Sequence, residues 1–205
     1  NIDNNTPAVV GFGAGYGTGA DIVFNSLTAT GGLPGLGGNN ILIANDQAGQ
    51  ARRIAVVLSG NNNFQADVMA QIIAVAPNVE AWFGADNGNG TFTGTTLTPS
   101  GGAIPGYRFG GHTNNGGVLT IANANVITDN FLGSPTPVYI GAMDQTDRNY
   151  TDGTIYIPQA QSFSGQVEIG QGGILQTGSD GSLGTGTADI LLKTGELRLN
   201  VASSS

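Results

Sequence analysis

The sequence predicts an all-β protein that winds into a parallel β-helix, and two observations carry this prediction. The first is the composition: 35 of the 205 residues are glycine, 39% are apolar and only 10% are charged. Glycine, threonine, valine and isoleucine suit turns and strands, whereas the polar residues that build long helices are scarce. The second is a spacing of about 20 residues between similar strand-like segments, which is typical of a repeat architecture.

The spacing is measured between the second apolar residues of these segments. The successive steps are 22, 20, 17, 19 and 22 residues, through Leu197, Leu175, Ile155, Val138, Leu119 and Leu97. Segments 166–170 and 188–193 are expected to form a second strand of the same turns. A parallel β-helix produces this pattern, because short strands of each coil stack on the next coil at about 4.8 Å. An antiparallel β-sandwich built from hairpins is the alternative that remains open.

Alternation within the strands predicts which side chains face outward. Tyr156 stands between Ile155 and Ile157, and Arg198 stands between two leucines. Because successive side chains of a strand point to opposite faces, we expect the tyrosine and the arginine to face solvent.

Two other local patterns concern the corners and ends of the predicted solenoid. Phe64, Phe92 and Phe163 each precede a strand-like segment and are expected to stack at a recurring corner. The segment 65–76 has apolar residues near helical spacing, so it forms either a short capping helix or two strands. Its β-branched residues favour strands slightly.

The C-terminal part resembles a known repeat. It begins with an aromatic-x-Gly element at 163–165. Two G-x-L segments follow at 173–175 and 195–199, with an S-L-G-x-G stretch between them at 182–186. This arrangement closely resembles the autotransporter-associated beta strand repeat, over roughly residues 91 to 200. The resemblance implies a right-handed parallel β-helix in a secreted or surface-exposed passenger with an adhesive or structural role. It implies no catalytic residues.

The N-terminal part has a different composition. Residues 1–40 are rich in glycine and are expected to supply an edge-docking or assembly strand, followed by a β-solenoid at 41–200 and a tail at 201–205. Gly15, Gly17 and Ala20 follow an apolar run, as in a dinucleotide-binding fingerprint. However, glycine at every second position from 11 to 19 suits an extended chain, and the acidic residue needed for the ribose is missing.

Charge and composition exclude several classes of partner. The net charge is −8 and the isoelectric point is near 4.2, which disfavours nucleic acid and anionic membrane surfaces. The sequence has no cysteine, so neither disulfides nor thiolate metal sites are expected. No apolar stretch approaches the roughly 18 residues of a membrane span.

One acidic loop is the candidate metal site. Asp144, Asp147 and Asp152 lie close together in the sequence with Arg148, and three hard oxygen ligands on one loop would hold Ca²⁺. A solvated loop and an acid–base pair of a glycosidase are the alternatives. No motif requires a cofactor, and calcium is the one that this loop would bind.

Two further groups of polar residues are weaker candidates for a site. Asp86, Asn87 and Asn89 resemble the start of a calcium loop but lack the closing acidic residue. His112 is the single histidine, so it supports neither a triad nor a histidine metal site. We therefore expect that the protein is not an enzyme.

The expected function is that of an extracellular or cell-surface structural or adhesive solenoid. The open edges at the ends of such a rod are templates for pairing, so we expect self-association into a filament or surface layer by end-to-end contact or strand addition. The alternative is a carbohydrate-binding or polysaccharide-degrading module that binds surface glycans. It would bind through exposed aromatic residues, and the candidates are Trp82, Tyr107, Tyr139, Tyr150 and Tyr156.

Overall fold

The computed structural model describes most of the chain from residue 53 onward and three short strands before it. The described residues are 8–12, 32–36, 39–42, 53–59, 61, 63–75, 77, 80–86, 88–102, 104–110, 117–133, 135–143, 152–185 and 189–200. They form mainly β-strands, with one α-helix, α1 (Val68–Val75), and one short 3-10 helix (Asp180–Leu183).

The strands form two large sheets and one small one. The seven-stranded sheet has the order β1 (Ala8–Phe12), β4 (Arg53–Ser59), β6 (Glu80–Asp86), β8 (Tyr107–Phe109), β10 (Val138–Ile140), β12 (Val167–Ile169) and β14 (Ile190–Leu192). The six-stranded sheet has the order β5 (Asn63–Phe64), β7 (Asn89–Phe92), β9 (Val118–Ile121), β11 (Gly153–Ile157), β13 (Gly173–Thr177) and β15 (Glu196–Leu199). The small sheet pairs β2 (Gly32–Leu36) with β3 (Asn39–Leu42) in antiparallel fashion.

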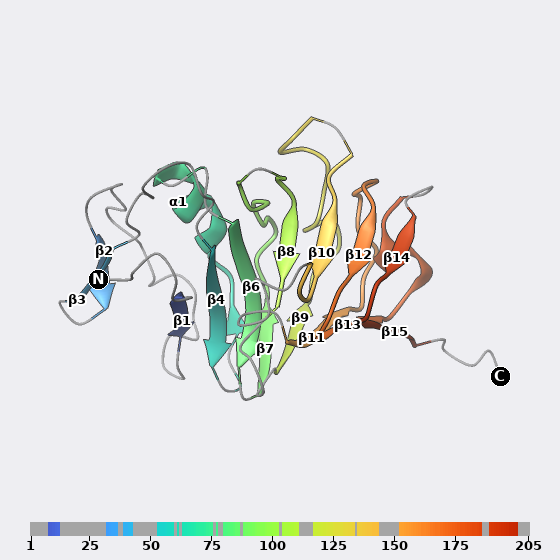
Figure 1. Ribbon diagram of the computed structural model, residues 1–205, viewed down its shortest axis with the longest axis horizontal. Helices are drawn as coiled ribbons and strands as arrows, with labels where there is room; N and C mark the ends of the chain where they lie inside the picture. Colours follow the sequence, from blue (N-terminus) through green and yellow to red (C-terminus); the bar gives the residue numbers. More distant parts are fainter. Residues whose placement is uncertain are drawn as a thin grey trace.

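From β4 onward the chain alternates between the two large sheets. We call each strand of the seven-stranded sheet and the strand that follows it in the six-stranded sheet a rung, so that β6 with β7 is one rung and β14 with β15 is the last. All pairs within the two large sheets are parallel. Figure 1 shows the rungs following one another along the longest axis. This is a β-solenoid-like arrangement, and the predicted alternative of a sandwich built from antiparallel hairpins does not describe it.

The core lies between the two large sheets, and stacked columns of inward side chains fill it. One column joins Val56, Phe83, Phe109, Ile140, Ile169 and Leu192 as strand partners. Another joins Leu119, Ile155, Leu175 and Leu197 across the six-stranded sheet. Except on the last rung, every member of both columns is buried. Alternation of apolar and polar residues therefore sorts core from surface, as the sequence predicts.

The predicted repeat length of about 20 residues is wrong for most rungs. Leu175 follows Ile155 by 20 residues and Leu197 follows Leu175 by 22, but Leu119 and Ile155 are partners 36 residues apart. Val138 lies in the other sheet, opposite Tyr107 and Val167. The predicted steps into and out of Val138 are therefore two halves of one turn. Strand-like segments occur in both sheets, so spacing alone does not separate one sheet from the other.

The glycine of each G-x-L segment lies where two rungs approach closely. A Cβ atom added at Gly173 would be 2.6 Å from the carbonyl oxygen of Ile140, and one added at Gly195 would be 2.5 Å from the carbonyl oxygen of Gly170. Any side chain would therefore collide with the backbone of the preceding rung. The motif recurs because the chain passes this point once per turn.

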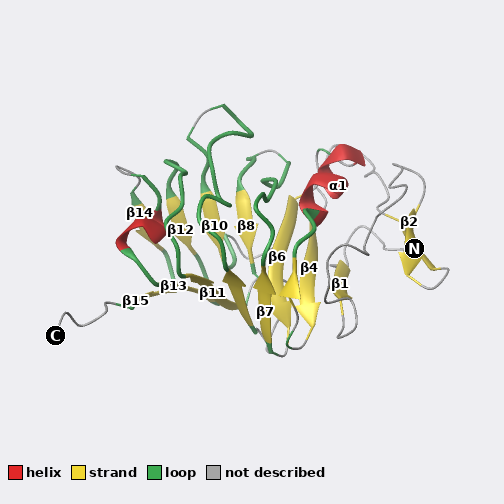
Figure 2. Ribbon diagram, turned by 180° about the vertical axis from the view of Figure 1, so that it is seen from behind, coloured by secondary structure: helices red, strands yellow, loops and turns green. Residues whose placement is uncertain are grey.

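The segment predicted as helix or strands forms the helix α1. It begins after Asp67, whose Oδ1 accepts a hydrogen bond from the backbone N–H of Ala70 at 3.0 Å, as an N-cap residue does. Val68, Met69 and Ile72 are buried in the main core. Figure 2 shows the helix beside β4 and β6, near the N-terminal end of the rungs.

The predicted stack of three phenylalanines is correct for two of them. Phe64 and Phe92 are strand partners in β5 and β7, whereas the residue before Phe163 bridges to Thr128 instead. Phe64 and Phe163 nevertheless occupy similar corners, because the carbonyl oxygen of each accepts hydrogen bonds from the backbone N–H and the hydroxyl of a threonine. These threonines are Thr93 and Thr185.

Polar side chains, one buried and one half-buried, clamp one rung to the next. Oε1 of Gln161 accepts hydrogen bonds from the backbone N–H groups of Val126 and Ile127, each at 2.9 Å. The carboxylate of Asp129 accepts hydrogen bonds from the backbone N–H and the hydroxyl of Ser164, at 3.2 and 2.6 Å. These bonds satisfy backbone donors at corners that the sheet ladders do not reach.

Candidate interaction surfaces

The acidic loop predicted to bind calcium is described only at Asp152. Asp144 and Asp147 lie outside the described residues. The carboxylate of Asp152 is half-buried and lies against Gly172, which has a positive φ of 76°. Within the described residues no group of three or more potential metal-binding side chains occurs. Calcium binding by this loop stays a prediction.

The other predicted polar sites are also partly described. Asn87 and His112 lie outside the described residues. Asp86 ends β6, and Asn89 begins β7 on the next segment of chain. The backbone N–H of Asn89 donates a hydrogen bond to Oδ1 of Asn61 at 3.0 Å. This bond links two neighbouring rungs, which is a structural role.

The prediction that five aromatic residues are exposed is wrong for two of them. Trp82 and Tyr107 are fully buried. Tyr107 points into the main core, where its hydroxyl donates to the carbonyl oxygen of Thr128 at 3.1 Å, and burial raises its pKa. Tyr150 lies outside the described residues, whereas Tyr139 and Tyr156 are partly exposed. Only these last two keep an accessible ring among the described aromatic candidates.

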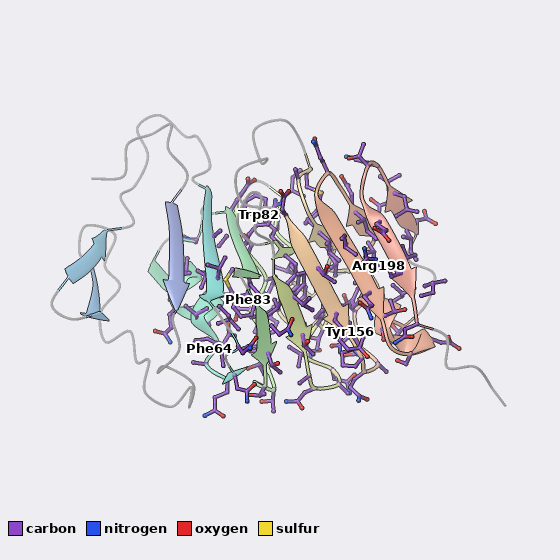
Figure 3. All side chains as sticks on the ribbon, turned by 90° about the horizontal axis from the view of Figure 1, so that it is seen from below. Phe64, Trp82, Phe83, Tyr156 and Arg198 are labelled. Atoms are coloured by element: carbon purple, nitrogen blue, oxygen red, sulfur yellow. The ribbon has the colours of Figure 1, made fainter. Side chains whose placement is uncertain are left out.

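Trp82 belongs to a cluster on the outer face of the seven-stranded sheet. Figure 3 labels Trp82 and Phe83, neighbours in β6 that lie on opposite sides of the strand. The guanidinium carbon of Arg108 lies 5.0 Å from the ring centroid of Trp82 and 4.7 Å from that of Tyr139. Nη2 of Arg108 donates to the carbonyl oxygen of Ile104 at 2.8 Å and lies 3.4 Å from Oε1 of Glu80.

The cluster stabilises the buried positive charge of Arg108 on the outer face of the seven-stranded sheet. Arg108 is only 5% exposed, and a buried cation is tolerated when a carboxylate and aromatic rings compensate for lost water. Its partners come from β6 and β10, the two strands beside its own. Burial also raises the pKa of Tyr139. The cluster ties three adjacent rungs together, and we assign it a structural role.

Among the strand side chains that the structure describes, the exposed large apolar ones all lie on the last rung. Its exposed apolar side chains are Ile190, Leu191, Leu192 and Leu199, with exposed fractions of 37, 40, 53 and 61%. Ile190 and Leu192 pair with buried residues of β12, so they continue inward columns. The core is therefore open to solvent at this end. Spacing alone did not single out these residues, because it does not tell which rung is the last.

The outer face of the six-stranded sheet is regular and almost uncharged. One column joins Asn63, Thr91, Thr120, Tyr156, Gln176 and Arg198. The neighbouring column joins Asn89, Val118, Thr154, Ile174 and Glu196. All of these side chains are half-buried or exposed. We call these two columns the ladder face.

The molecule gives no sign of a membrane-spanning helix among its described residues. Helix α1 has 8 residues, and none of the described helices has the length and hydropathy of a membrane span.

Comparison with known proteins finds no matching family model, no matching curated protein and no matching solved structure. The resemblance to the autotransporter-associated repeat stays a prediction that rests on the motif residues.

Proposed function

We propose that the protein is a structural or adhesive β-solenoid whose copies associate head to tail through the last rung. The observation that carries this proposal is the open end of the core at β14 and β15. The right-handed winding and the extracellular or cell-surface location belong to the same proposal, and they rest on the resemblance of residues 91–200 to the passenger repeat.

Two features of the last rung support an interaction there. β14 and β15 are the terminal strands of their sheets, so each has a free edge of backbone donors and acceptors with no described strand beside it. Monomeric proteins usually block such edges with lysine, proline or a bulge. β14 consists of Ile190, Leu191 and Leu192, which provide none of these protections.

The parallel pairing determines which partner fits. A second copy that continues the seven-stranded sheet in parallel must offer its first strand to the last strand of its neighbour. That first strand is β1, which lies at the opposite edge of the same sheet, next to β4. The contact joins two different surfaces and does not close on itself, so it builds a filament. When two copies associate in this way, the apolar side chains of β14 are removed from water.

Charge does not oppose stacking at this end. Lys193 forms an ion pair with Glu168 of the preceding rung, and Arg198 pairs with Glu196 at 2.7 Å. Lys193 and Arg198 are thus paired within the chain, whereas Asp189, directly before β14, is exposed. The net charge of −8 acts between copies over a distance of about 8–10 Å at physiological salt, so the filaments are expected to grow more readily as salt rises.

Negative-stain electron microscopy tests the proposal with one variant and one matched control. Leu192→Lys places a charge on the open end, whereas Ile104→Lys places the same charge on an exposed loop residue before β8. We expect filaments from the wild type and from Ile104→Lys, and isolated short particles from Leu192→Lys. Absence of wild-type filaments at all concentrations and salts, or normal filaments from Leu192→Lys, would contradict the proposal.

Removal of residues 1–12 tests the role of β1 in the contact. We expect this truncation to abolish filaments as well, since it removes the strand that pairs with β14 of the neighbour. Filaments that persist without β1 would refute the head-to-tail contact through that strand.

A further inference from the structure

We propose that the ladder face binds a neutral, extended polysaccharide chain, with the ring of Tyr156 as the stacking platform. This surface lies on the outer side of the six-stranded sheet, and only its β15 residues reach a free edge used for assembly. The proposal therefore does not depend on self-association. The class of ligand that we infer is a β-1,4-linked glucan.

Regular spacing is the first reason. Thr91, Thr120, Tyr156 and Gln176 lie on four successive rungs in direct register. Adjacent parallel strands are about 4.8 Å apart, which is close to the length of one pyranose unit in an extended chain. A glycan that runs across the strands therefore meets one of these side chains at about every sugar.

Free hydrogen-bonding capacity is the second reason. The side chains of Thr91, Thr120, Tyr156 and Gln176 form no hydrogen bond with any other residue that the structure describes. Hydroxyl and amide groups can both donate and accept, which matches the hydroxyl groups of a sugar. With respect to the described part of the chain, the four residues thus offer a row of polar groups that can bond to solvent or a ligand.

The position of the Tyr156 ring is the third reason. A Cβ atom added at Gly178 would lie 3.1 Å from the hydroxyl oxygen of Tyr156. The ring therefore reaches from β11 towards the chain that leaves β13, over a position without a side chain. The ring is partly exposed, and an aromatic ring has a negative face on which the C–H groups of a sugar can stack.

Charge selects a neutral chain. The described charges on the ladder face are Glu196 and Arg198, which lie on β15 in its two neighbouring columns. Figure 3 labels Arg198. The two charges neutralise each other through hydrogen bonds of 2.7 and 3.1 Å. A face without net charge, on a protein with a net charge of −8, attracts no anionic polymer and suits an uncharged one. A β-1,4-linked glucan is uncharged, extended and ribbon-like, whereas an α-1,4-linked glucan coils.

Isothermal titration with cellohexaose tests this inference on the Leu192→Lys variant, which keeps the assembly surface out of the measurement. Maltohexaose is the control for chain shape, and hexagalacturonate is the control for charge. We expect cellohexaose to bind more tightly than either control. The site is tested by three variants: Tyr156→Ala, Tyr156→Phe and the aromatic control Phe131→Ala, which removes a 45% exposed ring from a loop.

Tyr156→Ala is expected to weaken cellohexaose binding about tenfold, which corresponds to roughly 1.4 kcal/mol. Tyr156→Phe keeps the ring and should stay within about threefold of the parent, which corresponds to about 0.6 kcal/mol for the lost hydroxyl. Phe131→Ala should bind like the parent. No binding of cellohexaose, equal binding by Tyr156→Ala, or stronger binding of either control glycan would overturn the inference. None of these outcomes bears on filament formation, which the wild type tests separately.

Discussion

The last two rungs carry similar residues in the same register and differ sharply in their surroundings. Ile169 of β12 pairs with Leu192 of β14, yet the exposed fraction is 0% for the first and 53% for the second. The residues are both large and apolar, so their type does not explain the difference. Among the described strands, β12 has a neighbour on each side, whereas β14 has one. Burial in this architecture is thus supplied by the neighbouring rung, and the last rung lacks half of it.

The largest expected difference in stability is between alanine variants of two arginines, one on an inner rung and one on the last rung. Arg108 lies in an inner rung and is buried, whereas Arg198 lies on the last rung and is exposed. Arg108→Ala should lower the free energy of unfolding by about 3–5 kcal/mol, because it leaves Glu80 buried beside a cavity. Arg198→Ala should leave the free energy of unfolding unchanged within error. Urea denaturation followed by circular dichroism measures both.

Equal losses for the two arginine variants would break the comparison. They would mean that the last rung is covered in solution as fully as the inner rungs. The measurement is made on the Leu192→Lys background at low concentration, so that assembly does not supply the missing cover.

A smaller difference in stability is expected between alanine variants of two isoleucines in adjacent rungs. Ile169→Ala removes a fully buried side chain and should lower the free energy of unfolding by about 3 kcal/mol. Ile190→Ala, on the last rung, removes a side chain that is 37% exposed, and should cost less than about half of that. Urea denaturation is again the measurement. A larger loss for Ile190→Ala than for Ile169→Ala would contradict the assignment of the open end.

The smallest effect concerns a clamp between inner rungs and depends on pH. Burial raises the pKa of Asp129, but hydrogen bonds from Ser164 and Thr136 outweigh it, so the net pKa is lowered. The clamp therefore stabilises the fold above the pKa of the unfolded carboxyl group, and this stability is lost as the pH falls through the lower pKa of the folded state. Asp129→Ala should lower the free energy of unfolding by about 1–2 kcal/mol at pH 7.

Thermal unfolding of Asp129→Ala between pH 7 and pH 3 provides the control for that clamp. The difference in stability between the wild type and the variant should shrink towards low pH, because the wild-type carboxylate becomes protonated. A difference that stays constant over this range would show that the carboxylate charge does not contribute.

The sequence predicted the parallel arrangement and most of the strands near the C-terminus. Segments 166–170 and 188–193 contain β12 and β14, and Tyr156 faces outward as expected. The repeat length failed at Val138 because apolar alternation is the same in both sheets. The apolar spacing of residues 65–76 does not distinguish the helix α1 from two strands. Asp67 is an N-cap residue just before α1, and this signal favours the helix.

The surfaces were harder to predict than the strands. Trp82 was expected to be exposed, but it is buried. Arg108 lies over its ring, and Ala55 and Val57 form a buried cluster with it. The outward side of a strand is solvated only where nothing packs on it, and sequence alternation does not contain that information. The open end at Leu192 has the same cause, because alternation identifies an inward residue but not whether another rung follows it.

Sedimentation velocity over a concentration series tests the open end of the core most directly. We predict that the weight-average sedimentation coefficient of the wild type rises with concentration beyond that of a dimer. Leu192→Lys should sediment as a monomer throughout, and Ile104→Lys should behave like the wild type. A wild type that remains a single monomeric or dimeric species at every concentration would contradict head-to-tail assembly through the last rung.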